Sequence, residues 1–141
     1  TLEITETVFE RESQALRRQL HTLHEMGVRL SLDDFGTGYS SLLYLQRYPF
    51  DEIKIDMGFV ARMLEDDYSR RVVNTILGLA GTLGAEVVAE GVEDAATRDA
   101  LLAAGCAIGQ GYYYSYPLGA EDFRGLLEAR ATLPLAGGDA D

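Results

Sequence analysis

Residues 31–42 read Ser-Leu-Asp-Asp-Phe-Gly-Thr-Gly-Tyr-Ser-Ser-Leu, and the rest of the chain is organised around this stretch. The run Val28–Leu32 has the pattern of a strand, which delivers Asp33 and Asp34 to a glycine-rich loop. Adjacent aspartates repel each other unless a proton or a cation lies between them, and carboxylate oxygens suit magnesium or manganese. Such a pair by itself is more often an acidic turn, so the rest of the chain has to decide between the two interpretations.

Strand and helix patterns alternate along the chain. We expect strands at Thr1–Ile4, Val28–Leu32, Glu52–Asp56, Glu86–Glu90 and Cys106–Ile108. We expect helices at Ser13–Met26, Ser40–Arg47, Tyr68–Leu83, Ala95–Ala104 and Glu121–Ala131, where apolar residues recur at helical spacing. This alternation predicts an α/β fold whose parallel strands are joined by helical crossovers.

Composition and charge exclude several classes of function. The 141 residues suffice for one domain with its own core, and the net charge of −11 argues against binding a nucleic-acid polymer. A small phosphate ligand remains compatible, because bound divalent metals invert the field of an acidic pocket. The single cysteine, Cys106, cannot form an internal disulfide, which fits a reducing compartment, and no apolar run is long enough to span a membrane.

Charged and polar side chains gather at the C-terminal ends of the expected strands. They are Glu3, Glu6, Asp33, Asp34, Lys54, Asp56, Glu90, Glu93 and Gln110. In a barrel of alternating strands and helices, active sites are built at this edge. Carboxylates from several strands could bind two divalent ions and leave one residue as a base or an electrostatic partner. Lys54 is expected to point into the barrel mouth, either as an ion-pair partner of the aspartates or as a catalytic group.

The chain resembles the C-terminal part of the EAL domain, a bacterial family of cyclic di-GMP phosphodiesterases named for a Glu-Ala-Leu motif. The matching motifs are Glu3-Ile4-Thr5-Glu6, Asp33 to Leu42, Lys54-Ile55-Asp56, Val88-Ala89-Glu90-Gly91-Val92-Glu93, Gly105-Cys106 and Gln110-Gly111-Tyr112 with Ser115 and Pro117. They occur in the family's order and spacing up to about Leu127. The resemblance implies the last five or so βα units of a TIM-like (β/α)8 barrel, since a complete barrel takes ~250 residues.

The resemblance also implies a role for each matching residue. The metal ligands would be Glu3, Asp33, Asp34 and Glu90. The catalytic residues would be Lys54, Glu90 and Asp33, and the substrate-binding residues Glu93, Gln110 and Asp56. Glu6 is similar to the glutamate that anchors the loop from Phe35 to Ser41, in which Thr37, Gly38 and Ser40 would take part.

The implied reaction is the metal-dependent hydrolysis of cyclic di-GMP to linear diguanylate, which would make the protein a hydrolase of bacterial signal transduction. The implied cofactors are Mg2+ or Mn2+ at a two-ion site, with Ca2+ as an inhibitor. The implied partners are cyclic di-GMP, a second copy in a homodimer, and sensory or other signalling domains upstream. The expected location is the cytoplasm, or the cytoplasmic part of a larger membrane-anchored protein.

Some features of the family are missing. Its Glu-Ala-Leu motif and a ligating asparagine would lie upstream of Thr1, so residues 1–132 are expected to be the C-terminal part of the domain, inactive in isolation, followed by a disordered tail at 133–141. Met57-Gly58 and Tyr116 stand where the family often has basic or polar residues.

Other interpretations remain open at this point. A non-catalytic cyclic di-GMP receptor or interaction module is the main alternative, and a metal-dependent aldolase barrel would explain the acidic strand ends alone. His21 and His24 lie three residues apart, but are expected to be surface or packing residues. The run Tyr112–Tyr114 could stack on guanine, although strand alternation would direct only some of these rings toward a ligand.

Overall fold

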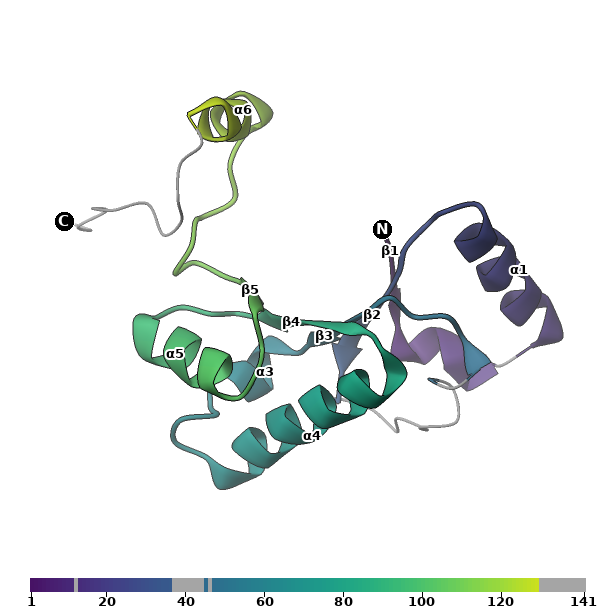
Figure 1. The fold of residues 1–141 in the computed structure, drawn as a ribbon, viewed down its shortest axis with the longest axis horizontal. Coiled ribbons are helices and arrows are strands. Elements are labelled where there is room, and N and C mark those ends of the chain that lie inside the picture. The colour runs from purple at the N-terminus through teal and green to yellow at the C-terminus, as the bar shows by residue number, and fades with distance from the viewer. Residues whose placement is uncertain (12, 37–44, 46, 130–141) are drawn as a thin grey trace.

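The computed structural model describes residues 1–11, 13–36, 45 and 47–129, and these residues contain one sheet of five parallel strands (Figure 1). The strands are β1 (Leu2–Thr5), β2 (Leu30–Phe35), β3 (Glu52–Ile55), β4 (Glu86–Glu90) and β5 (Ile108–Gln110), in that order across the sheet. The helices are η1 (Glu6–Arg11, 3₁₀), α1 (Gln14–Glu25), α3 (Met57–Val60), α4 (Asp67–Leu83), α5 (Ala95–Ala103) and α6 (Ala120–Glu128). The predicted α/β fold of parallel strands alternating with helices is therefore confirmed.

The two faces of the sheet differ in chemistry. On one face, apolar residues of four strands are buried: Ile4, Leu30, Leu32, Ile53, Ile55 and Ala89. Helices α3, α4 and α5 lie on this side (Figure 1), and α4 buries Val73, Ile76 and Ala80 in the same hydrophobic core. These contacts account for the apolar residues at alternate positions of these strands.

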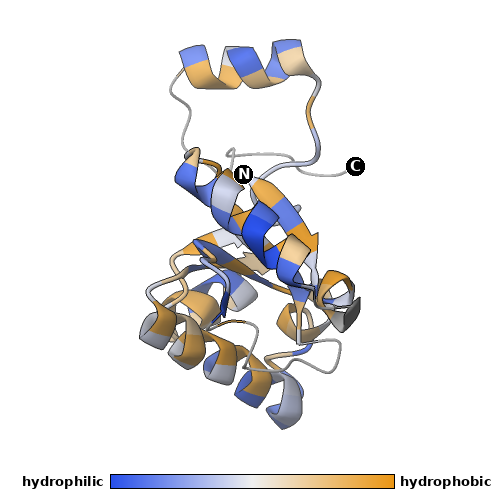
Figure 2. Cartoon of the chain, turned by 90° about the vertical axis from the view of Figure 1, so that its right-hand side faces the viewer, coloured by the Kyte–Doolittle hydropathy of each residue, from blue (hydrophilic) through white to orange (hydrophobic). Residues whose placement is uncertain are grey.

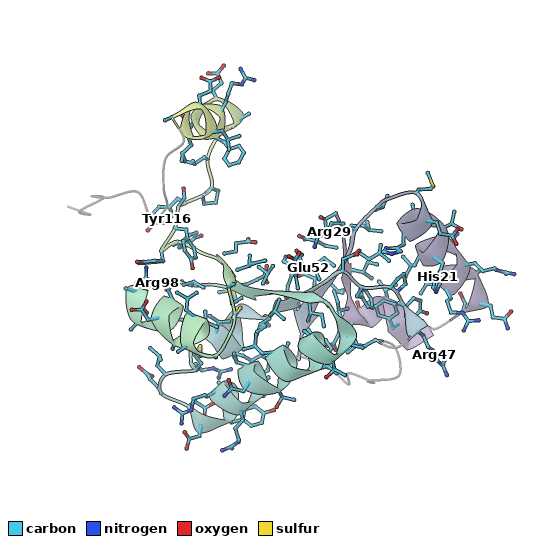
Figure 3. All side chains as sticks on the ribbon, in the orientation of Figure 1. His21, Arg29, Arg47, Glu52, Arg98 and Tyr116 are labelled. Carbon is cyan, nitrogen blue, oxygen red and sulfur yellow. The ribbon has the colours of Figure 1, made fainter. Side chains whose placement is uncertain are left out.

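The opposite face is polar, because successive side chains of a strand alternate between faces. Arg29 forms an ion pair with Glu86 there, and the Ser31 hydroxyl donates a 2.7 Å hydrogen bond to Glu52 (Figure 3). In register across the sheet, Glu3 lies beside Ser31, and Glu90 lies beside Gln110. The predicted site residues Glu3, Asp33, Lys54, Glu90 and Gln110, which lie on the strands, therefore share the face that the helices leave uncovered.

Two predicted strands begin in the wrong place. The second strand runs from Leu30 to Phe35 instead of Val28 to Leu32, and the fifth runs from Ile108 to Gln110 instead of Cys106 to Ile108. The cause is the same at both positions. The backbone N–H of Val28 bonds back to the Leu23 carbonyl at 3.0 Å, and that of Cys106 bonds to Leu101 at 2.9 Å, so these residues still belong to helix ends.

The helices agree better with the prediction. Those expected near residues 13–26, 68–83, 95–104 and 121–131 occur with their ends shifted by at most three positions. Two short elements, η1 and α3, were not predicted. The predicted helix Ser40–Arg47 lies mostly outside the described residues, as does the predicted tail at 133–141.

Helices α1 and α6 differ in how they meet the core. Figure 2, in which α1 faces the viewer, shows a mostly hydrophilic outer surface on this helix, and Leu20 on its inner side is buried. Helix α6 lies apart from the sheet (Figure 1), and none of its side chains is buried. No helix among the described residues is long and apolar enough to cross a membrane.

Candidate active site

An irregularity in β2 positions the two aspartates. Leu32 pairs with Ile53 and Phe35 pairs with Ile55, so Asp33 and Asp34 together lie opposite Lys54 of β3. This is a β-bulge, in which two residues of one strand face one residue of its neighbour. Asp34 has a backbone φ of 54°, a left-handed conformation that aspartate tolerates better than most residues. A regular strand would send the two carboxylates to opposite faces, and the bulge removes that constraint.

The bulge brings both aspartates to a glutamate of another strand. Asp33, Asp34 and Glu90 each offer one carboxylate oxygen, and these oxygens lie within 4.8 Å of one another. Hard oxygen ligands at this spacing fit magnesium or manganese. The donor set of this cluster therefore fits the divalent metal that the sequence predicted, with ligands from β2 and β4.

Lys54 lies at the centre of this acidic cluster. Its Nζ is 2.7 Å from Glu90 Oε1, 3.0 Å from Asp33 Oδ1 and 3.3 Å from Glu3 Oε1. The side chain is only 8% exposed. Burial alone would lower the pKa of Lys54, but the hydrogen bonds to Glu90 and Asp33 outweigh it and raise the pKa well above its ordinary value. The lysine is therefore a permanent positive charge that joins carboxylates of three strands.

Asp34 is the third carboxylate of this cluster. Desolvation, and then the negative charges of Asp33 and Asp56, raise the pKa of Asp34. Any cation that binds next to a carboxyl group whose pKa is raised in this way stabilises its ionised form.

A pocket of about 230 Å³ adjoins the cluster at Glu90. Its lining comes from the ends of β4 and β5 and the start of α3: Met57, Glu90, Gly91, Glu93, Gln110, Gly111 and Tyr112. Two glycines let the backbone segments approach closely. A methyl group added to Gly91 would lie 2.6 Å from Met57 Cβ, and one added to Gly111 would lie 2.2 Å from the Val92 carbonyl oxygen. The structure thus brings Glu93 and Gln110 together with Glu90.

The remaining predicted site residues are more dispersed. Glu6 Oε1 accepts a 3.1 Å hydrogen bond from the backbone N–H of Gly36, at the start of the loop it was predicted to anchor. Thr37, Gly38 and Ser40 of that loop lie outside the described residues. The Asp56 carboxylate accepts a 2.9 Å hydrogen bond from Gly58 N–H and caps α3, a structural contact that the sequence analysis missed.

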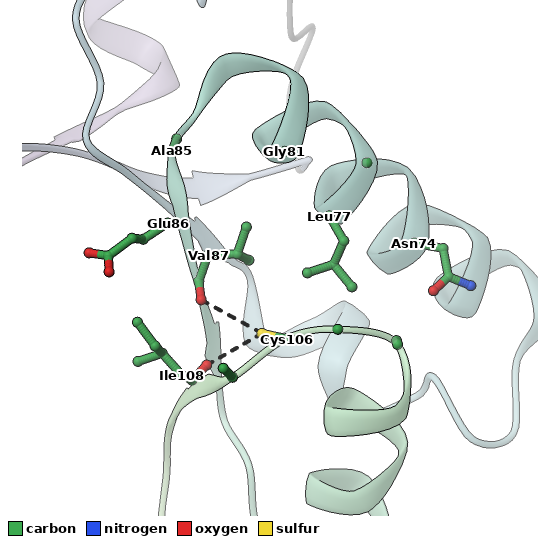
Figure 4. Close-up of a pocket in the computed structure, with 12 residues that line it drawn as sticks. Asn74, Leu77, Gly81, Ala85, Glu86, Val87, Cys106 and Ile108 are labelled. Atoms are coloured by element: carbon green, nitrogen blue, oxygen red, sulfur yellow. Dashed lines mark hydrogen bonds between the residues drawn. The ribbon is translucent and has the colours of Figure 1, made fainter.

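A larger hollow of about 560 Å³ lies elsewhere, between the last turns of α4 and the beginning of β4 and β5 (Figure 4). Cys106 lies in its wall, with Sγ 3.4 Å from the Ile108 carbonyl oxygen, and is buried. Burial raises the pKa of this thiol, which keeps it protonated and unreactive. This hollow is larger than the pocket at Glu90, but it lies at the N-terminal ends of β4 and β5. The carboxylate cluster lies at the C-terminal end of β4, so the smaller pocket is the candidate active site.

Two residues at or beside the smaller pocket were not predicted as site residues: Met57 lines it, and Tyr116 lies next to the lining residue Tyr112. Met57 was noted only as a departure from the family pattern, although it directly follows the Lys54–Asp56 run. Tyr116 contacts Tyr112 across a turn, with ring centroids 4.5 Å apart. Their spacing of four residues on an aromatic-rich segment was the available signal.

The fold and the cluster together define the strand-end site of a barrel-type protein that can hold divalent cations. The chain belongs to the EAL domain family, whose profile matches residues 1–117. Its sheet corresponds to part of the TIM-like barrel of that domain, as the EAL domain of DcpA from Mycobacterium smegmatis shows. That structure superposes with a TM-score of 0.86 at 39% identity, over 93% of this chain and 59% of the other.

Relatives with a named activity are also similar. MucR of Pseudomonas aeruginosa, described as a bifunctional diguanylate cyclase/cyclic di-GMP phosphodiesterase, is 45% identical over 120 residues. The aligned region is 85% of this chain but 18% of MucR. The structure of the MucR phosphodiesterase in complex with c-di-GMP has a TM-score of 0.81 at 44% identity and covers 86% of this chain and 49% of that one. The chain thus spans about half of that solved phosphodiesterase.

A further solved relative contains metal. BlrP1 of Klebsiella pneumoniae, solved as a manganese/cy-diGMP complex, has a TM-score of 0.75 at 35% identity, over 82% of this chain and 29% of that one. A calcium/cy-diGMP complex of BlrP1 superposes equally well.

Proposed function

We propose that residues 1–132 form the C-terminal part of a phosphodiesterase domain that hydrolyses cyclic di-GMP to linear diguanylate. The observation that carries this proposal is the position of Lys54, whose ammonium contacts carboxylates of three strands beside a cluster that fits a divalent cation. A permanent positive charge beside bound cations is suited to stabilise the negative charge of a transferring phosphoryl group. The likeness to MucR supports the choice of substrate.

In this proposal Asp33, Asp34 and Glu90 hold magnesium or manganese, and Glu3 of β1 adds a fourth carboxylate. When bound, two such ions activate the attacking water and neutralise the charge of the phosphoryl group. The chain's own contribution is orientation. Glu90 and Asp33 hold the Lys54 ammonium at 2.7 and 3.0 Å, so it meets the substrate phosphate without reorganising.

The adjoining pocket is proposed to bind the nucleotide. Glu93 and Gln110 line it together with Glu90, so polar groups for a base or ribose lie beside a member of the metal cluster. Asp56 supports the same region by capping α3, whose first residue, Met57, forms a wall of the pocket. Glu6 accepts the hydrogen bond from Gly36 N–H and so anchors the start of the loop that follows β2.

The proposed domain needs more than this chain. The strands β1 and β5 are paired on one side only within the described sheet, and the solved MucR phosphodiesterase is about twice as long. We infer that further metal ligands come from segments upstream, that the 141 residues alone hydrolyse cyclic di-GMP negligibly, and that the full protein acts in the cytoplasm with signalling domains attached.

The test is an assay of cyclic di-GMP hydrolysis by the protein at its natural length, with the linear product separated by chromatography. Activity in magnesium or manganese, loss in excess chelator, and inhibition by calcium are the expected results, since the looser geometry of calcium misplaces the nucleophile. Full activity in chelator would refute the mechanism. Tight binding without hydrolysis in any metal would instead show a non-catalytic cyclic di-GMP receptor.

A further inference from the structure

Three glutamates form a row across the uncovered face of the sheet. In register, Ser31 of β2 lies between Glu3 of β1 and Glu52 of β3. Glu86 of β4 lies on the other side of Glu52. Lys54 follows Glu52 by two positions, so it leaves β3 on the same face and one step nearer to the candidate active site. Carboxylates that are neighbours on one sheet face repel each other, so the partner that each glutamate takes matters for the site above the row.

Two of these glutamates have a cation as partner. Glu3 Oε1 lies 3.3 Å from Lys54 Nζ, and Glu86 forms an ion pair with Arg29. The contact of Glu3 shows that a glutamate of this row reaches the Lys54 ammonium even from a strand two positions away in the sheet. Glu52 lies on the same strand as the lysine and faces the same way, so its carboxylate has the reach for the same contact.

Glu52 is held by a neutral donor instead. The Ser31 hydroxyl donates a 2.7 Å hydrogen bond to Glu52 Oε1, a short distance that is typical of an ionised acceptor. The Ser31 side chain is fully buried, so solvent does not compete for its hydroxyl. Within the described part of the chain, Glu52 forms no ion pair, although Figure 3 shows it near Arg29 and Lys54 is two residues away. The serine therefore takes the place of a cation for this carboxylate.

We propose that Ser31 is a positioning residue, which keeps the Glu52 carboxylate away from the Lys54 ammonium. The proposal rests on the proposed function, in which this ammonium meets the substrate phosphate. Glu90 and Asp33 hold Lys54 Nζ on the side of the C-terminal edge of the sheet. Glu52 precedes Lys54 on β3, so an ion pair with Glu52 would draw the ammonium in the opposite direction, away from the metal cluster. Ser31 thus acts through Glu52 and not on the substrate itself.

The experiment measures kcat and KM for cyclic di-GMP in magnesium, with the protein at its natural length. Ser31→Ala should lower kcat ~10- to 100-fold, the range for loss of a group that orients a residue of a metal site. KM should change little, because the charge of Lys54 acts mainly on the transition state. Ser31→Thr keeps the hydroxyl and should retain most of the wild-type kcat. Ser69→Ala is the matched control with unchanged kcat, because it also removes a fully buried hydroxyl that binds a carboxylate, that of Asp66.

A double variant separates positioning from a general structural defect. In Ser31→Ala/Glu52→Gln the side chain at position 52 carries no charge that attracts Lys54, so kcat should return close to the wild-type value. Both variants lack the same hydroxyl, and a merely structural role would leave kcat equally low in the two. A crystal structure of Ser31→Ala gives a readout that is independent of turnover. It should show the Glu52 carboxylate within the ion-pair distance of about 4 Å from Lys54 Nζ.

The outcomes distinguish this proposal from the proposed function. Unchanged kcat in Ser31→Ala, or equally low kcat in Ser31→Ala and the double variant, would overturn the positioning role and leave the proposed function intact. Wild-type protein that hydrolyses no cyclic di-GMP would overturn the proposed function. The crystal structure of Ser31→Ala would then still decide whether the serine keeps Glu52 from Lys54, and a carboxylate that stays away from the ammonium would refute it.

Discussion

Lys54 Nζ lies 2.7 Å from Glu90 Oε1, although Lys54 is paired in register with Val88, two residues earlier on β4. The lysine side chain therefore leans along its strand toward the C-terminal edge of the sheet, the direction in which strand side chains commonly lean. This places a positive charge among carboxylates that would otherwise repel one another.

Replacing this lysine should expose the repulsion. In Lys54→Met, Glu3, Asp33 and Glu90 lose their common cation, and we expect the free energy of unfolding to fall by about 2 kcal/mol, since hydrogen bonds to charged groups contribute about 1.5–3 kcal/mol. Added magnesium should raise the melting temperature of this variant more than that of the wild type, because a divalent ion neutralises the same carboxylates. Thermal denaturation with and without magnesium measures both effects.

Arg29→Met is the control, because it removes an arginine that is half exposed in its ion pair with Glu86. Surface ion pairs contribute about 0–1 kcal/mol, so this variant should be nearly as stable as the wild type. Equal losses of stability in the two variants would contradict the prediction that Lys54 stabilises the fold more than a surface ion pair does.

Glu90→Gln tests the chemistry in the protein at its natural length. Turnover of cyclic di-GMP should fall at least ~100-fold while binding survives, because loss of a metal ligand or base acts mainly on the transition state. Glu86→Gln, at the opposite end of the same strand, should have near wild-type turnover. The measurement is chromatography of linear diguanylate, and an unchanged rate in Glu90→Gln would exclude its proposed role.

The cap of α4 should make stability depend on pH. Hydrogen bonds from the Ser69 hydroxyl and from the backbone N–H groups of Ser69 and Tyr68 lower the pKa of Asp66. A carboxyl with a lowered folded-state pKa stabilises the fold above its unfolded pKa of ~3.9, and this contribution is lost as the pH falls through the folded value. Asp66→Asn should therefore melt below the wild type at neutral pH and converge with it below pH ~4. Glu65→Gln, which removes a charge from the same loop, should show no such convergence in thermal melts.

A side chain at position 111 should destabilise the fold. A methyl group there would lie 2.2 Å from the Val92 carbonyl oxygen, and a backbone atom cannot turn aside as a side chain can. Gly111→Ala should lower the free energy of unfolding by about 1–3 kcal/mol, as overpacking commonly does. Gly125→Ala in α6, where the added methyl group meets no neighbour within 4 Å, should leave it unchanged or raise it slightly. Urea denaturation of both variants decides the point.

The two sheet edges predict association. Strands β1 and β5 end the described sheet, and proteins rarely leave such edges unpaired. We expect the 141-residue chain on its own to associate through them, so light scattering should report a mass above that of one chain. A stable monomer at high concentration would contradict this expectation.

The sequence by itself determined the class of fold and most element positions, because both depend on local patterns. Apolar spacing predicted α4 at Asp67–Leu83 to within one residue, and β4 at Glu86–Glu90 to the residue. Six motifs in the family's order, three of which contain Asp33, Lys54 and Glu90, were sufficient to identify the family. Strand starts were less accurate, because the hydrogen bonds that hold Val28 and Cys106 to helix ends are not visible in hydrophobic periodicity.

Only the tertiary structure decided how these side chains meet. Two adjacent aspartates in a regular strand would face opposite ways, and it is the mismatch in length between Leu32–Phe35 and Ile53–Ile55 that places both opposite Lys54. The contact of Tyr112 with Tyr116 likewise depends on a turn held by Val92, a residue of a different segment. Both arrangements arise from pairing between distant parts of the chain, which residue order at any one place does not encode.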